Sequence, residues 1–179
     1  DLIKLGNDQP RFQFGLDLNA SWKGFDMRVF FQGVGKRDFW PGYVAFWASS
    51  NQNIWYMLGF EEHLDYFRNT PSGDLDVNLD SYYPRPLLNA KNQYMQTKYL
   101  QDASYIRLKN FTFGYTIPQK YTQRIKVANL RLFFTGENLW TGTRLSSVFD
   151  PEGINGNDKI SGIGYPIMKT WACGLTITL

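Results

Sequence analysis

Few residues in this chain could carry out catalysis, and their spacing does not form a catalytic site. The single histidine, His63, has no second His or Cys at the spacing of a zinc site, and we interpret it as part of the solvated face of a short helix over Gly59–Arg68. No serine stands in a nucleophile elbow, and no glycine run joins a strand to a helix as a phosphate-binding loop would. The sequence therefore predicts a protein that is not an enzyme and holds no cofactor.

Metal binding has one weak candidate, the oxygen-rich stretch Asp150–Asp158. Carboxylate and amide oxygens suit Ca²⁺, but this stretch lacks the ligand spacing and the closing Glu of an EF-hand loop. Asp, Asn and Gly also form tight turns, which is the interpretation we favour. A cation bound in this loop stays the alternative.

Three tryptophans are the best candidates for binding another molecule. Trp40, Trp47 and Trp55 all fall in one long segment without strand-like alternation. An aromatic face can stack on a sugar ring or anchor a protein interface. A segment of this length also needs a small core of its own, so packing within the segment is the alternative.

The composition argues against several classes of protein. Hydrophobic residues make up 43% of the chain and the formal net charge is +3, with basic residues scattered, so nothing indicates a nucleic-acid-binding surface. No apolar run reaches the roughly 18 residues of a transmembrane helix. One cysteine, Cys173, cannot form an intrachain disulfide. The chain opens at Asp1 without a leader, and we expect it to be a piece of a longer protein.

Alternating apolar and polar residues predict five long β-strands, because successive side chains of a strand point to opposite faces. The predicted strands cover about 11–22, 25–34, 104–117, 129–140 and 169–179. Lys23-Gly24 predicts a tight turn between the first two strands. The apolar phase slips within the third strand, and a β-bulge near Lys109-Asn110 would restore it.

One face of each predicted strand is apolar and the other is mostly polar. On the apolar face, Trp22 and Trp171 near strand ends are typical of a membrane-interface belt, and Cys173 is interpreted as a lipid-facing structural thiol. The polar residues of the other face are expected to line a lumen or to form a network with neighbouring strands. They are Asp17, Asn19, Asp26, Arg28, Arg131 and Glu137.

The connections between the strands alternate short, long, short and long. Loops over about 35–103 and 141–168 are far longer than ordinary connections. This pattern is typical of a transmembrane antiparallel β-barrel, whose short turns face the periplasm and whose long loops face outwards. Five strands are too few to close such a barrel, so they would form part of a larger one. The alternative is a soluble β-sandwich that binds carbohydrate through aromatic loops.

Short motifs along the whole chain carry a resemblance to a known family. The most specific is the run Ala103–Pro118. The others are Asn7–Phe12, Gly24–Asp26, Phe31–Gly33, Tyr83–Arg85, Gly136–Leu139, Asp150–Glu152 and Gly164–Pro166. In this order they resemble the SusC/RagA family of TonB-linked outer-membrane proteins of Bacteroidetes. Phe67–Pro71 departs from the family, because it stands where a tryptophan motif is often found.

The resemblance implies the last five strands of a 22-stranded barrel that encloses a plug domain. Such proteins import oligomeric nutrients, glycan or peptide fragments, across the outer membrane of Gram-negative bacteria. TonB supplies the energy through the plug, and a SusD-like surface lipoprotein covers the extracellular loops as a lid. Trp40, Trp47 and Trp55 would then contact the substrate or this lid. The plug and the residues that contact TonB would lie outside this chain.

The last predicted strand, Lys169–Leu179, would pair with the first strand of the complete barrel. Its apolar residues resemble the C-terminal signal that the outer-membrane assembly machinery reads. They are Trp171, Leu175, Ile177 and Leu179. The family usually ends on an aromatic residue, whereas this chain ends on Leu179.

Overall fold

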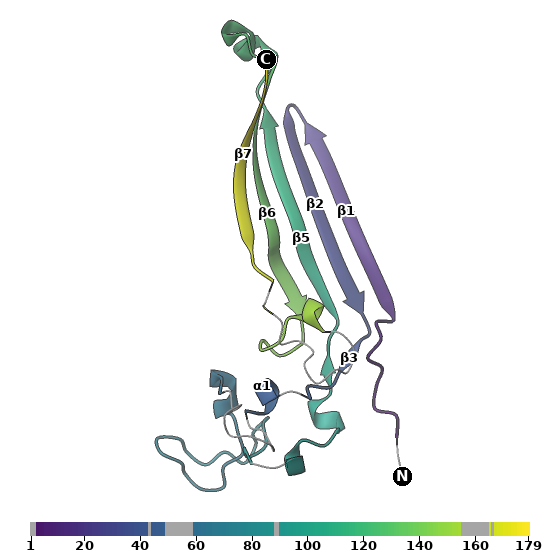
Figure 1. The fold of residues 1–179 in the computed structure, drawn as a ribbon, viewed down its shortest axis with the longest axis vertical. Coiled ribbons are helices and arrows are strands. Elements are labelled where there is room, and N and C mark those ends of the chain that lie inside the picture. The colour runs from purple at the N-terminus through teal and green to yellow at the C-terminus, as the bar shows by residue number, and fades with distance from the viewer. Residues whose placement is uncertain (1–2, 43, 49–58, 88–89, 155–164, 166) are drawn as a thin grey trace. The chain divides into compact units, whose positions relative to one another are not determined.

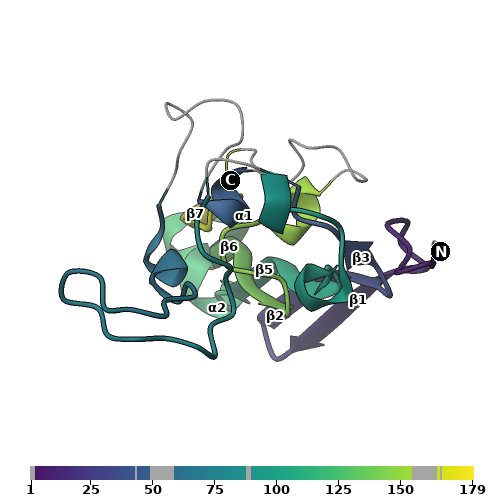
Figure 2. The same cartoon turned by 90° about the horizontal axis from the view of Figure 1, so that it is seen from below.

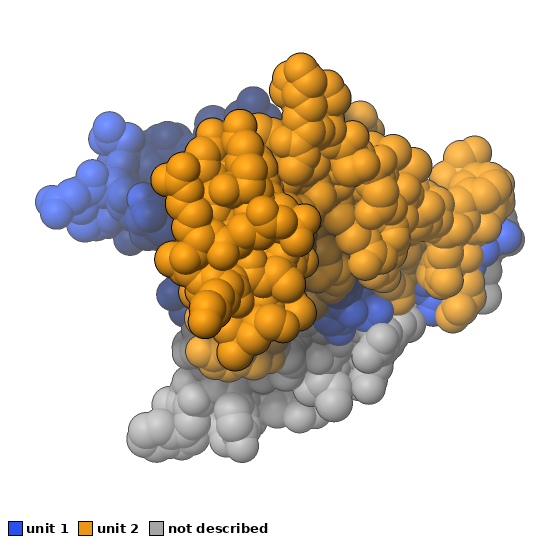
Figure 3. All heavy atoms as spheres, turned by 90° about the horizontal axis from the view of Figure 1, so that it is seen from above, with its two compact units in different colours: residues 1–8, 38–101, 146–164 blue, residues 9–37, 102–145, 165–179 orange. Residues whose placement is uncertain are grey.

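The computed structural model describes residues 3–42, 44–48, 59–87, 90–154, 165 and 167–179. The chain divides into two compact units, which Figure 3 colours separately. The sheet unit comprises residues 9–37, 102–145 and 165–179, and the loop unit comprises residues 1–8, 38–101 and 146–164. No helix among the described residues is long and apolar enough to cross a membrane.

Five antiparallel strands form the sheet unit, as the alternation predicted. They are β1 Phe12–Trp22, β2 Phe25–Gly35, β5 Tyr105–Thr116, β6 Asn129–Thr143 and β7 Thr170–Thr178. The strands lie side by side in the order β1-β2-β5-β6-β7 (Figure 1), and Figure 2 shows them end-on. Two helical turns, α2 Gln119–Thr122 and η5 Gln123–Ile125, connect β5 to β6.

The strand register keeps apolar residues of all five strands on one face. Leu18 pairs with Val29, and Val29 pairs with Phe111, so the same face continues from β1 through β2 to β5. Large side chains on this face are exposed: Leu16 by 50%, Trp22 by 68%, Leu132 by 49% and Ile177 by 53%. A sheet in contact with water on this side would expose far more apolar surface than soluble proteins do.

A bulge in β5 maintains this arrangement. In the pairing of β5 with β2, Leu108 and Asn110 pair with the consecutive residues Phe31 and Phe30, which leaves Lys109 as the additional residue. This confirms the bulge predicted near Lys109-Asn110. Because of the additional residue, Leu108 and Phe111 lie on the same face although their numbers differ in parity.

The loop unit has an aromatic core of its own. Phe46 is fully buried, and its ring centroid lies 4.9 Å from that of Trp47, 5.3 Å from that of Tyr83 and 6.3 Å from that of Phe149. In the described parts of the two long connections, the regular elements are short. They are β3 Asp38–Phe39, α1 Val44–Trp47, η2 Glu61–Leu64, η3 Ala90–Asn92, η4 Thr97–Tyr99, β4 Gln101–Asp102 and η6 Pro151–Gly153.

The helix predicted over Gly59–Arg68 is wrong. Only the 3₁₀ turn η2 forms there, and Arg68 instead pairs with Asn78 in an antiparallel bridge. The Arg68 guanidinium donates to the carbonyl oxygens of Leu64 and Asp76 at 2.6 and 2.8 Å. These bonds give side-chain partners to carbonyl groups in and beyond the predicted segment, and so stabilise a hairpin in place of a longer helix.

Gly33 gives a test of how tightly the apolar face is packed. A Cβ on Gly33 would lie 2.2 Å from Cζ of Phe14, whereas a Cβ on Gly35 of the same strand would meet nothing closer than 3.6 Å, at Phe12. We predict that Gly33→Ala lowers the free energy of unfolding by about 1–3 kcal/mol through overpacking, and that Gly35→Ala is nearly neutral. Urea unfolding of the complete protein in detergent measures both. The cost of Gly33→Ala should largely vanish in a Phe14→Ala background; an equal cost there would contradict the steric cause.

Candidate functional site

Arg28 and Arg131 each form an ion pair on the polar face of the sheet unit, and the pair of Arg28 joins β1 to β2. The Arg28 guanidinium donates to both carboxylate oxygens of Asp17, from Nε at 3.1 Å and from Nη2 at 2.6 Å. Asn19 adds a hydrogen bond from Nδ2 to Asp17 Oδ1 at 3.3 Å. These side chains share one face because Asn19 pairs directly with Arg28, and Asp17 lies two residues from Asn19 along β1.

The second ion pair reaches across a whole strand. Arg131 of β6 donates to Asp26 of β2, from Nε at 3.0 Å and from Nη2 at 2.5 Å, and β5 lies between the two strands. Gly114 of β5 makes this crossing possible, because a Cβ there would lie 2.5 Å from Arg131 Nη2 and 2.7 Å from Asp26 Oδ1. The bidentate pair therefore occupies the space that a side chain at Gly114 would fill.

A shallow hollow of about 470 Å³ lies among these groups on the polar face. Asp26, Arg28 and Arg131 line it with Thr112 and Asn19. The charges there are already paired, so the hollow offers amide, hydroxyl and paired ionic groups for hydrogen bonding. Such a surface can bind a polar partner, but it brings together none of the acid–base or nucleophilic pairs needed for bond cleavage. Glu137 lies further along β6, paired with Thr170 of β7.

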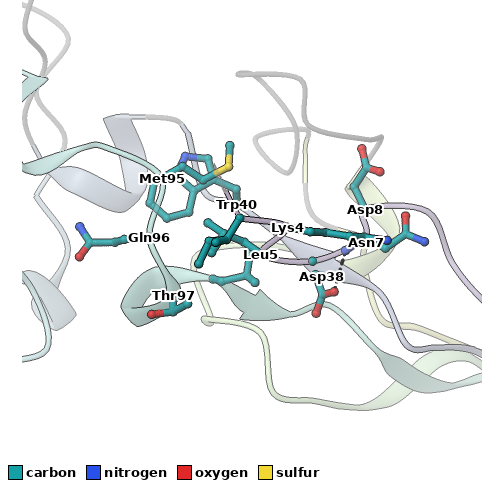
Figure 4. A pocket seen from close by; sticks show the side chains of 12 residues that line it. Lys4, Leu5, Asn7, Asp8, Asp38, Trp40, Met95, Gln96 and Thr97 are labelled. Atoms are coloured by element: carbon teal, nitrogen blue, oxygen red, sulfur yellow. Dashed lines mark hydrogen bonds between the residues drawn. The ribbon is translucent and has the colours of Figure 1, made fainter. Parts of the chain in front are cut away.

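Trp40 borders a hollow of about 680 Å³ within the loop unit (Figure 4). Leu5, Met95 and Leu100 supply apolar surface, and Asp38, Gln96 and Thr97 supply polar groups. The segment before β1 is held here by a hydrogen bond from Asn7 N–H to Asp38 Oδ2 at 2.8 Å. Trp40 is only half-buried, so part of its ring is accessible. An aromatic face beside amide and hydroxyl groups can hold a sugar ring or a peptide side chain.

The other two candidate tryptophans are placed differently. Trp47 is 5% exposed, its Nε1–H donates to the Pro41 carbonyl oxygen at 2.7 Å, and its ring packs 5.0 Å from that of Tyr99. Trp47 is therefore part of the loop-unit core. It still contacts the site, because its ring centroid lies 5.7 Å from that of Trp40. Trp55 lies outside the described residues.

His63 is buried, so the solvated position predicted for it is wrong. Only 7% of the residue is exposed, and its Nδ1 accepts a hydrogen bond from Phe60 N–H at 2.9 Å. Nε2 lies 3.0 Å from the Phe46 carbonyl oxygen, which can only accept. The imidazole therefore carries its proton on Nε2 and is neutral. With both nitrogens engaged, His63 joins η2 to α1 and is not placed to bind a metal.

Tyr83 is a further residue of the loop-unit core, and its role is not apparent from the sequence. Burial raises the pKa of Tyr83 to about 12, with a further contribution from the nearby Glu62 carboxylate. Its ring packs 5.0 Å from His63 and 5.3 Å from Phe46. The motif Tyr83–Arg85 marked this position, but nothing in the local sequence indicated which residues it contacts.

The oxygen-rich stretch predicted as a turn begins at the η6 turn. Asp150 Oδ1 accepts a hydrogen bond from Glu152 N–H at 2.9 Å and so caps η6. Residues 155–158 of this stretch lie outside the described part of the chain. Among the described residues, no cluster of three or more His, Cys, Asp or Glu side chains could hold a metal ion.

The residues predicted as an assembly signal lie on the exposed apolar face of β7 or directly follow it. Trp171 is 59% exposed, Leu175 and Ile177 are each 53% exposed, and Leu179 is 92% exposed. Cys173 is also exposed on this strand. Their role in assembly stays a prediction.

Two curated proteins are similar to nearly the whole chain. TonB-dependent receptor P3 of Formosa agariphila is 27% identical over 97% of this chain and 17% of its own length. TonB-dependent receptor P26 of the same organism is 29% identical over 99% of this chain and 18% of its own length. The chain thus spans less than a fifth of these relatives. No model of a known protein family matches it.

Solved structures share the fold. The RagAB peptide importer in its open-open state superposes with a TM-score of 0.67 and 20% identity, over 97% of this chain and 18% of that one. Its closed-closed state gives a TM-score of 0.64, with 20% identity over 96% of this chain and 18% of that one. At these identities the likeness is one of fold.

The crossing of Arg131 over Gly114 can be tested by a double-mutant cycle. We predict that Gly114→Ala displaces the Arg131 guanidinium and lowers the free energy of unfolding by about 1 kcal/mol or less, because partly exposed ion pairs contribute little. In an Arg131→Gln background the same substitution should cost almost nothing. Urea unfolding of the complete protein measures the coupling. Equal costs in both backgrounds would show that Gly114 serves another purpose.

Proposed function

We propose that this chain, a portion of a SusC/RagA-type TonB-dependent receptor, forms wall strands and extracellular loops of an importer in the outer membrane. The wall would belong to a 22-stranded barrel, completed by the remaining strands and closed inside by a plug domain. TonB would act on that plug, and a SusD-like surface lipoprotein would cover the loops. The cargo would be oligomeric nutrient, either glycan or peptide fragments.

The observation that carries this proposal is one sheet with two different faces. Its apolar face continues across all five strands and is exposed at large side chains such as Leu16 and Trp22. A β-sandwich would bury such a face against a second sheet, yet the described residues provide only the two-stranded pair β3-β4 besides this one. Hydrocarbon lipid is the environment that favours this exposure.

The polar face then meets the interior of the barrel. Hydrogen bonds join Asp17 to Asn19 and Arg28, and a second group joins Asp26 to Arg131. Glu137 shares the face and would also line the lumen. Because these charges are paired, they produce no strong field of one sign in a water-filled or plug-filled interior. Passing cargo would therefore meet mainly hydrogen-bonding groups. This portion of the receptor would perform no bond chemistry.

The two-faced wall can be tested by placing a fluorescent label at neighbouring positions. In a Cys173→Ser background, we predict that a label at Leu18→Cys is quenched by nitroxide lipid and that one at Asn19→Cys is quenched by aqueous iodide. Phe113→Cys and Thr112→Cys repeat the comparison on β5. The measurement uses the complete receptor in phospholipid vesicles. Equal iodide quenching at all four positions, or recovery of the protein without detergent, would contradict the membrane wall.

The Trp40 hollow is the proposed contact for cargo or for the lipoprotein lid, and Trp47 serves as its matched control. We predict that Trp40→Ala reduces uptake of a labelled peptide digest or of labelled oligosaccharides severalfold while the fold is kept. Trp47→Ala should instead destabilise the loop unit by about 3–5 kcal/mol, because it removes a buried ring. Cell uptake and protease resistance of the loops distinguish the two effects. If Trp40→Ala changed neither the uptake of both cargo classes nor the amount of lipoprotein recovered with the receptor, the Trp40 hollow would not be the contact.

A further inference from the structure

The end of the sheet that carries the short connections is strongly basic. Lys23 stands in the β1–β2 turn, and Lys120, Arg124 and Lys126 stand in the β5–β6 connection. The two connections lie together, because Thr116 N–H donates to the Gly24 carbonyl oxygen at 2.8 Å. All four side chains are exposed, and none forms an ion pair with another described residue. The connection over 117–128 contains no acidic residue that could neutralise them.

Exposed apolar side chains accompany these cations. Trp22 is 68% exposed, Tyr121 is 59% exposed and Ile125 is 65% exposed. Two of the cations lie over the neighbouring rings, Lys23 Nζ at 4.8 Å from the Trp22 centroid and Lys120 Nζ at 4.7 Å from the Tyr121 centroid. Each of these ammonium groups is thus held close to an exposed aromatic surface.

The helical turns α2 and η5 separate the two kinds of side chain. Lys120 and Arg124 are four residues apart, and so are Tyr121 and Ile125, so each pair lies on one side of the turn. Thr122 is 2% exposed and marks the side that packs against the protein. The connection therefore presents one basic and one apolar stripe outwards, a pattern typical of segments that lie at a membrane interface.

We propose that this end of the sheet binds the anionic phosphate headgroups of the lipid leaflet that it borders. We name its four basic residues the phosphate collar. The collar consists of Lys23, Lys120, Arg124 and Lys126. Its apolar neighbours continue the exposed face of the strands, since Trp22 pairs with Phe25 at the last position of that face. Residues that directly follow a hydrocarbon-facing strand lie at the depth of the lipid headgroups, where the phosphates are. The inference rests on the proposed membrane wall and adds a preference for lipid charge.

The collar can be tested by counting lipids retained on the complete receptor. The receptor in neutral detergent is exposed to equal amounts of phosphatidylglycerol and phosphatidylcholine, and native mass spectrometry counts each bound lipid. We expect the natural protein to retain phosphatidylglycerol preferentially. The triple variant Lys120→Gln, Arg124→Gln, Lys126→Asn should lower that preference at least about tenfold, since each cation near an anionic surface contributes roughly a fivefold effect. Raised salt should weaken the preference in the natural protein.

Two control variants separate charge position from net charge. The charge-retaining variant Lys120→Arg, Arg124→Lys, Lys126→Arg should keep the preference. The variant Lys4→Gln, Lys91→Gln, Lys98→Gln removes three charges from the loop unit and should also keep it. Equal phosphatidylglycerol retention by the natural protein and the collar variant would contradict the proposed lipid preference. That conclusion would hold even if the same cations bound a periplasmic protein. A receptor recovered in the soluble fraction without detergent would overturn the membrane wall itself.

Discussion

The sheet unit depends on one constraint: every strand must pair its backbone while its side chains alternate between an apolar and a polar face. The antiparallel ladders satisfy the first requirement along β1, β2, β5, β6 and β7. The alternation of side chains is kept across the sheet only if the register is kept from strand to strand, because a slip of one residue would exchange the two faces. Lys109 shows how sensitive this is, since without its bulge Phe111 and Tyr115 would turn to the polar side. The additional residue Lys109 therefore determines on which face the side chains of half of β5 lie.

Large side chains lie flat on the polar face because small residues lie beneath them. Arg131 crosses β5 above Gly114, and the Phe133 ring covers Gly174, where a Cβ would lie 2.1 Å from Cζ of that ring. The Arg131 guanidinium also lies 5.1 Å from the Phe133 centroid. Asp26, Arg131 and Phe133 thus connect four strands in a thin layer. A thin layer keeps the charges paired and leaves the space above the sheet for whatever the polar face meets.

The sequence predicted the sheet well and the loop unit poorly, for a physical reason. Strand alternation, the Lys23-Gly24 turn and the bulge are local signals, so a single segment reveals each of them. The partners of Phe46 in the loop unit are Tyr83 and Phe149, far away along the chain, and no local pattern indicates that they meet. For the same reason, the local sequence does not indicate that His63 is buried. Alternation places Asp26 and Arg131 correctly on the polar face, but it does not predict their contact across 105 residues.

Charge is distributed unevenly between the two units. The sheet unit holds thirteen basic and four acidic residues, a formal charge of +9, whereas the loop unit holds six basic and twelve acidic residues, a formal charge of −6. Cations of the sheet unit gather where strands end: Lys23 and Lys126 at the short connections, and Lys36 and Lys169 beside the long ones. Between these ends, Arg28 and Arg131 each hold a carboxylate. In the proposed membrane wall, the cations at the strand ends would lie where phosphate borders the hydrocarbon layer.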